Sequence, residues 1–298
     1  MTILADNQQY HIEHADCIEH MADMPDRCID FAVFSPPFPS LYAYTDSERD
    51  VGNSEDFKGD AKLHLSFFYH RLLPLIKPGR VVAVHVMQIP RLKRSGGVGI
   101  LDFRGLNIRI AERAGFVYEY DWSIRKNPQA QAIRTRSREL QFTGLESDRA
   151  KSRGALPDHI LKFRAPGDND VPIVNADVSR NDWIKLAEHH WNDIRETETL
   201  NKAEGRDDDD TKHICPLQLE VIRRLVVLFT NHGEIVFSPF AGIGSEGYVA
   251  LMNNRRFYGI ELKDSYVKAA VGNMKKAIGR ECNEKALFES REGEPGRI

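Results

Sequence analysis

The stretch EIVFSPFAGIGSEG, at residues 234–247, decides the fold class of this chain. Residues 234–237 predict a buried strand, residues 238–247 predict a glycine-rich turn, and a helix is expected to follow to about residue 253. Residues 257–261 predict the next strand, which ends at Glu261. Glycines let the backbone approach a ligand, the helix N-terminus offers free N–H groups, and an acid ending the next strand can bind ribose hydroxyls. The pattern therefore predicts an adenosine-type cofactor, with NAD and S-adenosylmethionine both left open.

Strands and helices also alternate before and after the central part of the chain. Strands are predicted at 10–15, 28–34, 81–86 and 116–124, and helices at 18–24, 60–77 and 106–114. After the central part, helices are predicted at 216–229 and 265–278, with a tail from Gly279 that is expected to fray. Residues 125–211 lack this rhythm. The alternation on both sides of a dissimilar segment predicts one doubly wound α/β sheet with an inserted module.

Composition places the chain among globular proteins. Its 298 residues are 41% hydrophobic and 29% charged. No run approaches the roughly 18 apolar residues of a membrane span, and the N-terminus lacks the features of a signal peptide. The 4 cysteines form no CxxC pair, so neither a zinc site nor a disulfide framework is indicated. We therefore predict a soluble, cytoplasmic protein with no metal and no membrane partner.

The near-neutral total charge of -3 hides two opposite segments. Residues 122–164 contain ten Lys or Arg against four Asp or Glu, a local charge of +6. Residues 165–211 contain thirteen acids against five bases, a local charge of -8. Clustered Lys and Arg predict a phosphate-binding surface, although two solvated faces that cancel would give the same totals.

A second motif, Ser35-Pro36-Pro37-Phe38, follows the apolar run at 28–34. Stiff prolines at the carboxyl end of a buried strand direct backbone carbonyls into the crevice where α/β sheets bind ligands. A carbonyl and the Ser35 hydroxyl can accept hydrogen bonds from an exocyclic amino group, and the Phe38 ring can stack on a planar base. An ordinary proline turn is the alternative for this motif taken alone.

Together the two motifs resemble those of the amino-directed DNA methyltransferases. Residues 35–38 look like the catalytic motif (S/N/D)PP(Y/F/W) of that family, and residues 237–245 look like its S-adenosylmethionine loop, commonly DPFxGSG. The catalytic motif precedes the cofactor loop, as in the permuted β group. Residues 14–17, 73–80, 122–128 and 213–218 resemble further family segments in the same order, and parts of 152–168 look like the middle region of phage and prophage versions.

The resemblance implies a Rossmann-like, doubly wound S-adenosylmethionine-dependent methyltransferase sheet with an inserted DNA-recognition region. It divides the chain into a catalytic half at 1–121, a target-recognition insert with an acidic linker at 122–211, and a cofactor-binding half with a charged tail at 212–298. The implied catalytic residues are Ser35, Pro36, Pro37 and Phe38. The implied cofactor-binding residues are Asp16, Cys215, Phe237, Ser238, Phe240, Gly242, Gly244 and Glu261. The candidate DNA-binding residues are Arg125, Lys126, Arg134, Arg136, Arg138, Lys151 and Arg153.

The implied mechanism is direct methyl transfer to the exocyclic amino group of a flipped base in double-stranded DNA, without a metal or a covalent intermediate. None of the 4 cysteines lies in a Pro-Cys nucleophile motif, which disfavours attack on carbon 5 of cytosine. Ser238 stands where the family loop usually has Asp, which leaves one expected polar contact to the cofactor open, and Ala15 replaces a glycine. The resemblance implies that the enzyme works in the cytoplasm of a bacterial cell or of a phage-infected host. It is also compatible with a homodimer.

Several alternatives stay open from the sequence. Serine at the first motif position is more usual for N4-cytosine enzymes, so we favour cytosine over the alternative, N6 of adenine. An NAD-dependent oxidoreductase would use the glycine-rich turn and Glu261, but it leaves residues 35–38 and the basic segment unexplained. Protein and RNA methyltransferases usually place the cofactor loop first and use Asn-Pro-Pro-Tyr. This sequence has the opposite order and Ser-Pro-Pro-Phe, which disfavours both classes. A non-enzymatic DNA-binding module would need neither site motif.

Overall fold

The order of helices and strands follows the predicted alternation. The computed structural model describes residues 3–38, 60–91, 99–135, 145–174, 177–200 and 216–292. The elements are β1 (Tyr10–His14), α1 (Cys17–Asp23), β2 (Phe31–Phe34), α2 (Asp60–Leu75), β3 (Val81–Met87), β4 (Ile89–Pro90), β5 (Ile100–Leu101), α3 (Phe103–Ala114), β6 (Val117–Ile124), α4 (Pro128–Thr135), β7 (Asp158–Arg164), α6 (Arg180–Leu186), β8 (His190–Trp191), α7 (Leu219–Phe229), β9 (Ile235–Ser238), α8 (Ser245–Met252), β10 (Arg256–Glu261) and α9 (Asp264–Glu292).

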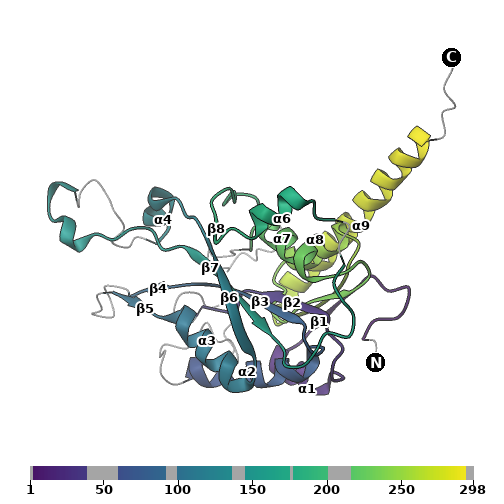
Figure 1. Cartoon of the computed structure of the whole chain (residues 1–298), viewed down its shortest axis with the longest axis horizontal. Helices are drawn as coiled ribbons and strands as arrows, with labels where there is room; N and C mark the ends of the chain where they lie inside the picture. Colours follow the sequence, from purple (N-terminus) through teal and green to yellow (C-terminus); the bar gives the residue numbers. More distant parts are fainter. Residues whose placement is uncertain are drawn as a thin grey trace, which may run out of the picture.

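One mixed sheet organises these elements. Within the described ranges it has eight strands in the order β1-β10-β9-β2-β3-β7-β6-β8, and β4 and β5 pair separately (Figure 1). The five strands from β1 to β3 are parallel. From β2 the chain passes through α2 to β3, whereas from β9 it passes through α8 to β10 on the other side. The carboxyl ends of β2 and β9 therefore meet at the point where the winding changes direction, which is where doubly wound sheets bind ligands.

Helices cover both faces of the sheet, and this explains the continuous apolar runs in the sequence. On β2, Ala32 and Phe34 pack in a core with α1, α2 and α3, while Phe31 and Val33 pack in a second core with α7, α8 and α9. Figure 1 shows the first three helices below the sheet and the other three above it on the right. A strand that is buried on both faces needs apolar residues at every position. The predicted doubly wound α/β fold is confirmed.

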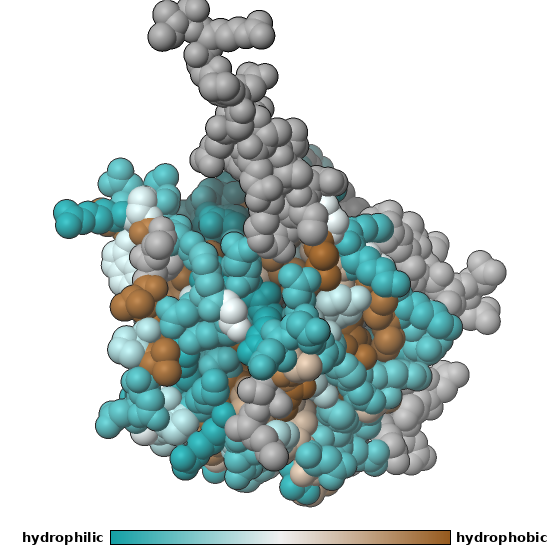
Figure 2. All heavy atoms as spheres, turned by 90° about the vertical axis from the view of Figure 1, so that its right-hand side faces the viewer, coloured by the Kyte–Doolittle hydropathy of each residue, from teal (hydrophilic) through white to brown (hydrophobic). Residues whose placement is uncertain are grey.

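One face of the molecule is mostly polar (Figure 2). Figure 2 shows that the face on the right of Figure 1 is mostly hydrophilic, with hydrophobic residues in small groups. No helix in the described part of the chain is long and apolar enough to cross a membrane.

The structure places one strand of the sheet within residues 125–211, the segment in which the sequence shows no alternation of strands and helices. Asp158–Arg164 forms β7, which pairs antiparallel with β3 on one side and with β6 on the other. The strand is difficult to predict from the sequence because its apolar residues alternate with Lys and Arg side chains that form ion pairs within the sheet. Lys162 Nζ and Arg164 Nε lie 2.7 and 2.6 Å from the carboxylate of Glu119 on β6. Part of the basic segment is therefore neutralised within the fold.

Two element boundaries also differ from the prediction. Helix α7 begins at Leu219 after an N-cap at Gln218, so Pro216 precedes the helix instead of lying in its first turn. Helix α9 continues to Glu292, although a fraying tail was expected from Gly279. The helix continues through Gly279, since a glycine inside a helix lowers the stability of the helix by only about 1 kcal/mol.

Candidate active site

The two sequence motifs meet on adjacent strands. Strand β2 pairs in parallel with β9, with Phe31 opposite Val236 and Ala32 opposite Phe237. Ser35 therefore leaves β2 beside the turn that leaves β9, although about 200 residues separate them along the chain. Both motifs contribute to one cavity. Its wall is formed by Ala15, Asp16, Cys17, Ile18, Ser35, Pro36, Pro37, Phe38, His64, Leu65, Phe68, Pro216, Leu217, Pro239, Phe240, Ala241, Gly242, Ile243, Ser245, Glu246, Glu261, Leu262 and Tyr266.

The glycine-rich turn has the backbone conformation that its glycines permit. Gly242 and Gly244 have φ values of 52° and 84°, in the left-handed region. A Cβ at Gly244 would lie 3.1 Å from the Cβ of Ala270, so α9 packs directly against the turn. A Cβ at Gly242 would meet no atom within 4 Å, so this residue leaves space open at the cavity wall. The turn thus brings backbone, without side chains, to the cavity.

Two carboxylates are held by backbone N–H groups at the ends of neighbouring strands. Glu261 Oε2 accepts a hydrogen bond from Gly242 N at 2.8 Å, and Oε1 accepts one from Lys263 N at 2.9 Å. Asp16 is the N-cap of α1, and its Oδ1 accepts hydrogen bonds from Ile18 N and Glu19 N. Because β1 and β10 are parallel, with His14 opposite Glu261, both carboxylates lie at the same edge of the sheet. Both carboxylates border the cavity, where a ligand can reach them.

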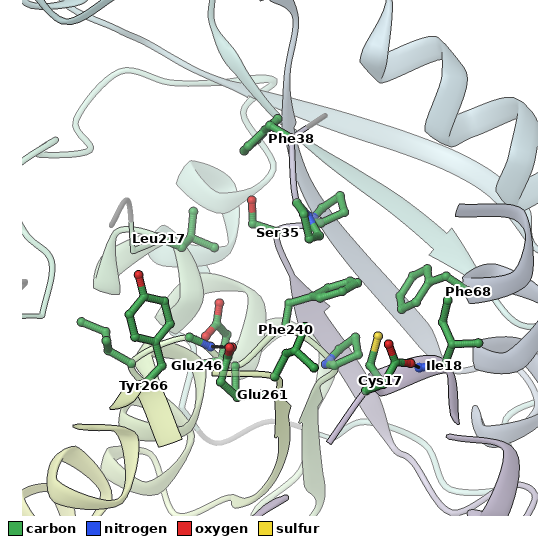
Figure 3. Close-up of a pocket in the computed structure, with 18 of the residues that line it drawn as sticks. Cys17, Ile18, Ser35, Phe38, Phe68, Leu217, Phe240, Glu246, Glu261 and Tyr266 are labelled. Atoms are coloured by element: carbon green, nitrogen blue, oxygen red, sulfur yellow. Dashed lines mark hydrogen bonds between the residues drawn. The ribbon is translucent and has the colours of Figure 1, made fainter. Parts of the chain in front are cut away.

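Glu246 is a further carboxyl group in the wall that the sequence did not single out. It lies in the first turn of α8 and is 5% exposed. Burial raises the pKa of Glu246 to about 8, and the charge of Glu261 adds to the rise. Figure 3 shows Glu246 and Glu261 together beside Tyr266, with Phe240 between them and Cys17. This end of the cavity therefore contains several acidic groups.

Ser35 forms the other polar part of the wall, and it lies at one end of a row of side chains. Ser35 Oγ is 3.0 Å from His85 Nδ1, and His85 Nε2 is 3.0 Å from Asp158 Oδ2. Lys126 Nζ is 2.5 Å from the same oxygen of Asp158. Burial alone would raise the pKa of Asp158, but the charges of His85 and Lys126 outweigh it and hold the pKa at about 2. Neither His85 nor Asp158 was predicted from the sequence.

Phe38 is in the wall but is mostly packed. It is 8% exposed, and its ring centroid lies 5.4 Å from that of Phe103 at an interplanar angle of 54°. In Figure 3 it lies beyond Ser35, on the side away from Glu261. The ring is thus fixed by α3 at one edge of the cavity.

The arrangement of site and fold agrees with a comparison with protein families. A family model described as DNA methylase, N6_N4_Mtase, matches residues 29–272. The chain belongs to this family. The match includes both motifs and the strands that carry them, and it confirms the resemblance to amino-directed DNA methyltransferases.

Individual relatives are similar to this chain over shorter segments. The chain is 32% identical over 71 residues to the DNA adenine methyltransferase YhdJ of Escherichia coli (strain K12), a segment that covers 24% of each protein. It is 38% identical over 63 residues to the type II methyltransferase M.BglII of Bacillus subtilis, which covers 21% of this chain and 18% of that protein. The chain thus matches less than a quarter of the length of either relative.

Solved structures share the fold of this chain over most of its length. TTHA0409 of Thermus thermophilus, complexed with S-adenosyl-L-methionine, superposes with a TM-score of 0.65 at 19% identity and covers 91% of this chain and 94% of its own. PvuII DNA methyltransferase (cytosine-N4-specific) superposes with a TM-score of 0.62 at 16% identity and covers 91% of this chain and 87% of its own. These likenesses support the fold class.

Not every residue predicted for cofactor binding lies in the cavity wall. Asp16, Phe240, Gly242 and Glu261 do, whereas Phe237 is fully buried in the core on β9. Ser238 is also fully buried, and its Oγ has no hydrogen-bond partner among the described residues. Gly244 supports the turn from behind, at the N-cap of α8. Cys215 lies outside the described residues.

The predicted DNA-binding residues are described only in part. Arg125 is exposed, Lys126 is paired with Asp158, and Arg153 Nη1 donates a hydrogen bond to the carbonyl of Gly154 at 3.0 Å. Arg136 and Arg138 lie outside the described residues, as do the side chains of Arg134 and Lys151. Within the described ranges, no group of three or more His, Cys, Asp or Glu side chains is arranged to hold a metal ion.

Proposed function

We propose that this chain transfers the methyl group of S-adenosyl-L-methionine to the exocyclic amino group of a flipped base in double-stranded DNA. The observation that carries the proposal is the meeting of the Ser35–Phe38 motif and the Gly242–Gly244 turn on one cavity, in a chain of the DNA methylase family. The relative YhdJ is named as a DNA adenine methyltransferase and the structural neighbour PvuII as cytosine-N4-specific. Both names support DNA as the substrate class.

The acidic end of the cavity fits the cofactor. S-adenosyl-L-methionine supplies, when bound, an electrophilic methyl group on a positively charged sulfur. Glu261 offers carboxylate oxygens to two ribose hydroxyls, and the space at Gly242 admits a ligand to the backbone. Asp16 adds a second carboxylate to the same end, and Glu246 adds a carboxyl group that burial keeps protonated. A cationic ligand is favoured there because the described wall contains carboxyl groups and no Lys or Arg.

The Ser35 end of the cavity fits the base. Ser35 Oγ and a backbone carbonyl of the proline motif accept the N–H groups of the amino nitrogen, which draws that nitrogen toward tetrahedral geometry and makes its lone pair available for attack on the methyl carbon. The base must leave the helical stack to reach Ser35, at a cost of about a few kcal/mol. Phe38 offers its ring at the edge of this end.

A covalent route through cysteine is disfavoured by the wall itself. Cys17 is the cysteine that the described wall contains, and burial, with the charges of Asp16 and Glu261, raises its thiol pKa well above the usual value. The group therefore stays a thiol, which is a poor nucleophile compared with a thiolate. Direct transfer to the amino nitrogen needs no such nucleophile.

The proposed target is N4 of cytosine, because the motif begins with serine. N6 of adenine is the competing outcome, since both bases place an amino group beside a ring nitrogen. Contacts from the basic segment to DNA phosphates, a homodimeric assembly and a cytoplasmic location in a bacterial or phage-infected cell stay predictions.

Analysis of the product tests this function. The protein is incubated with S-adenosyl-L-methionine and unmethylated DNA of mixed sequence, the DNA is digested to nucleosides, and these are identified by mass spectrometry. We expect N4-methylcytosine, and the Ser35→Ala variant serves as the negative control. N6-methyladenine would move the target to the other base, and the absence of any methylated nucleoside would contradict the proposal.

A further inference from the structure

A row of four side chains crosses the sheet behind the proposed base end of the cavity. In the register of β2 and β3, Phe34 lies opposite Val84, so the next pair is Ser35 and His85. Asp158 begins β7 opposite Met87, two positions from the partner of His85, and Lys126 follows β6 two positions after Ile124, the partner of Asp158. Because side chains two apart share a face, all four lie on one face and at one edge of the sheet. The order is Ser35, His85, Asp158, Lys126.

Burying this row of polar and charged side chains costs free energy of folding, which suggests that the row serves the function of the site. The side chains of His85, Asp158 and Lys126 are 12%, 4% and 9% exposed. Apolar residues of similar size usually stabilise a buried position as well as an ion pair does, because charges lose their hydration on burial. The neighbouring strand positions on this face, Ala83 and Ile160, are apolar and fully buried. Polar side chains therefore occupy positions where apolar core residues would be expected, and these positions lie directly behind the hydroxyl of Ser35.

The contacts favour one direction of hydrogen bonding along the row. His85 Nε2 forms no hydrogen bond among the described residues, but the negative charge of Asp158 Oδ2, 3.0 Å away, favours the ring tautomer that holds its proton on Nε2. In the neutral ring Nδ1 is then an acceptor, and it lies 3.0 Å from Ser35 Oγ. Ser35 donates its single proton to Nδ1, and the lone pairs of Oγ are left for the cavity. The carbonyl of His85, 3.3 Å from Oγ, is the competing acceptor for the same proton.

We propose that His85, held by Asp158, is a positioning residue for methyl transfer, which orients the Ser35 hydroxyl as an acceptor and takes up its proton. The proposal rests on the proposed function of the cavity. Lys126, on the far side of Asp158, holds this carboxylate in place and ionised. The other charged groups nearby, Asp121 and Arg104, contact His159 or each other on the opposite face of β7.

The proton movement balances the reaction. As the bond from nitrogen to the methyl carbon forms, the bond from that carbon to sulfur breaks, and the positive charge moves from sulfur to the amino nitrogen. One N–H proton then passes to Ser35 Oγ while the hydroxyl proton passes to His85 Nδ1. The resulting imidazolium is paired with Asp158 until it releases the proton to solvent. The products are a neutral methylated base, a neutral sulfide and one proton.

Two substitutions of His85 distinguish its role in orienting the Ser35 hydroxyl from its role in accepting the proton. His85→Ala removes both the acceptor and the base, and we expect a loss of about 100-fold in the single-turnover rate at saturating DNA and cofactor, the lower end of the usual contribution of acid–base catalysis. His85→Asn keeps an oxygen acceptor near the position of Nδ1 but cannot take the proton, and we expect a loss of about 10-fold. Affinity for both substrates, measured by titration, is expected to stay within about 3-fold in either variant, a range that lies below the smaller of these losses.

Asp158→Asn and a control on the same strand complete the test. Asp158→Asn removes the negative charge that favours the proton on Nε2 and that pairs with the imidazolium, so we expect a loss close to that of His85→Ala. His159→Asn changes the adjacent residue, which is 17% exposed and faces Asp121, and it is expected to keep the wild-type rate. Thermal unfolding of each variant shows whether the fold persists, and His85→Asn provides a second reading if His85→Ala does not fold.

Each outcome decides between the proposals. A wild-type chain that methylates DNA while His85→Ala keeps its rate would overturn the role of His85 and leave the proposed function intact. Equal losses in His85→Asn and His85→Ala would overturn the orienting part, and a wild-type rate in His85→Asn would overturn the proton transfer. A wild-type chain that methylates no DNA would sink the proposed function itself.

Discussion

Buried carboxyl groups at the two ends of the cavity have pKa values that are shifted in opposite directions. At the Gly242 end, Glu246 has no cationic partner beside it in the wall, and burial raises its pKa to about 8. At the Ser35 end, Asp158 lies between His85 and Lys126, which hold its pKa at about 2. The difference shows how one sheet edge can keep a buried carboxyl group protonated where it lacks a cationic partner and ionised where it has two. The ends should therefore respond differently to substitution.

The largest effect is expected at the Ser35 end. Ser35→Ala removes the hydroxyl that accepts the amino group, and we expect methyl transfer to fall by at least about 100-fold, as when one positioned polar group in an active site is lost. Cofactor affinity, measured by calorimetric titration, should be unchanged because Glu261 and the turn are intact. Ser123→Ala, at a buried serine on β6 that is not in the wall, is the matched control. Normal transfer by Ser35→Ala would remove Ser35 from the mechanism.

At the opposite end, Glu261→Gln should affect the cofactor and spare the DNA. The substitution removes a charged acceptor worth about 1.5–3 kcal/mol per hydrogen bond, so we expect the cofactor to bind roughly 10- to 100-fold more weakly. Glu13→Gln, on the neighbouring strand and outside the wall, controls for the loss of one charge. Unchanged cofactor affinity in Glu261→Gln, measured by the same titration, would argue against its contact with ribose.

Phe38 should have a smaller effect, because its ring is already packed on α3. Phe38→Leu keeps much of the packing and removes the aromatic face, and we expect a loss of about 10-fold in kcat/KM for DNA, within the 1–3 kcal/mol of a base stacked on an aromatic ring. Phe103→Leu changes the ring that supports it without changing the wall. If Phe103→Leu lowers kcat/KM as much as Phe38→Leu, the role of Phe38 is packing.

The smallest effect concerns stability and follows from Glu246. Its folded pKa of about 8 lies above its usual value of 4.5, so the folded state holds a proton that the unfolded chain has lost between these pH values. Its contribution to stability is therefore full below pH 4.5 and is lost as the pH rises toward 8. Relative to Glu246→Gln, the free energy of unfolding of the wild type should fall by at least about 1 kcal/mol across this range, measured by urea unfolding.

Glu220 gives the control of opposite sign. Burial tends to raise its pKa, but hydrogen bonds from Arg223 and Arg224 outweigh this and lower it. The contribution of Glu220 is therefore present above its usual pKa and is lost as the pH falls. Against Glu220→Gln, the wild type should lose stability at acidic pH. The same slope for both variants would mean that the two sites do not differ in the way described.

The sequence predicted the parts of the site that depend on local backbone structure. The Gly242–Gly244 turn needs positive φ, the Ser35–Phe38 motif ends a strand buried on both faces, and Glu261 ends the next strand. Each of these is visible in a short stretch of residues. The pairing of β2 with β9 then brings the two motifs to one cavity, because the carboxyl ends of parallel strands lie at one edge of the sheet.

The row behind Ser35 could not be predicted because it depends on register between strands far apart in sequence. His85 stands in an apolar run, where a single histidine gives no sign of its partner. Asp158 begins a strand that contains Lys162 and Arg164, which count toward the local positive charge of the sequence although both pair with Glu119 in the structure. Phe237 and Ser238 were placed by resemblance alone, which does not tell whether a residue at the end of β9 faces the cavity or the core.

One comparison tests most directly whether the two ends act separately. Transfer of a labelled methyl group from S-adenosyl-L-methionine to DNA is measured in a single turnover, with cofactor raised until binding is saturated, for the wild type, Ser35→Ala and Glu261→Gln. The account predicts that excess cofactor restores Glu261→Gln to within a few-fold of the wild-type rate, whereas Ser35→Ala stays at least about 100-fold slower. Failure of excess cofactor to restore Glu261→Gln, or its restoration of Ser35→Ala, would contradict it.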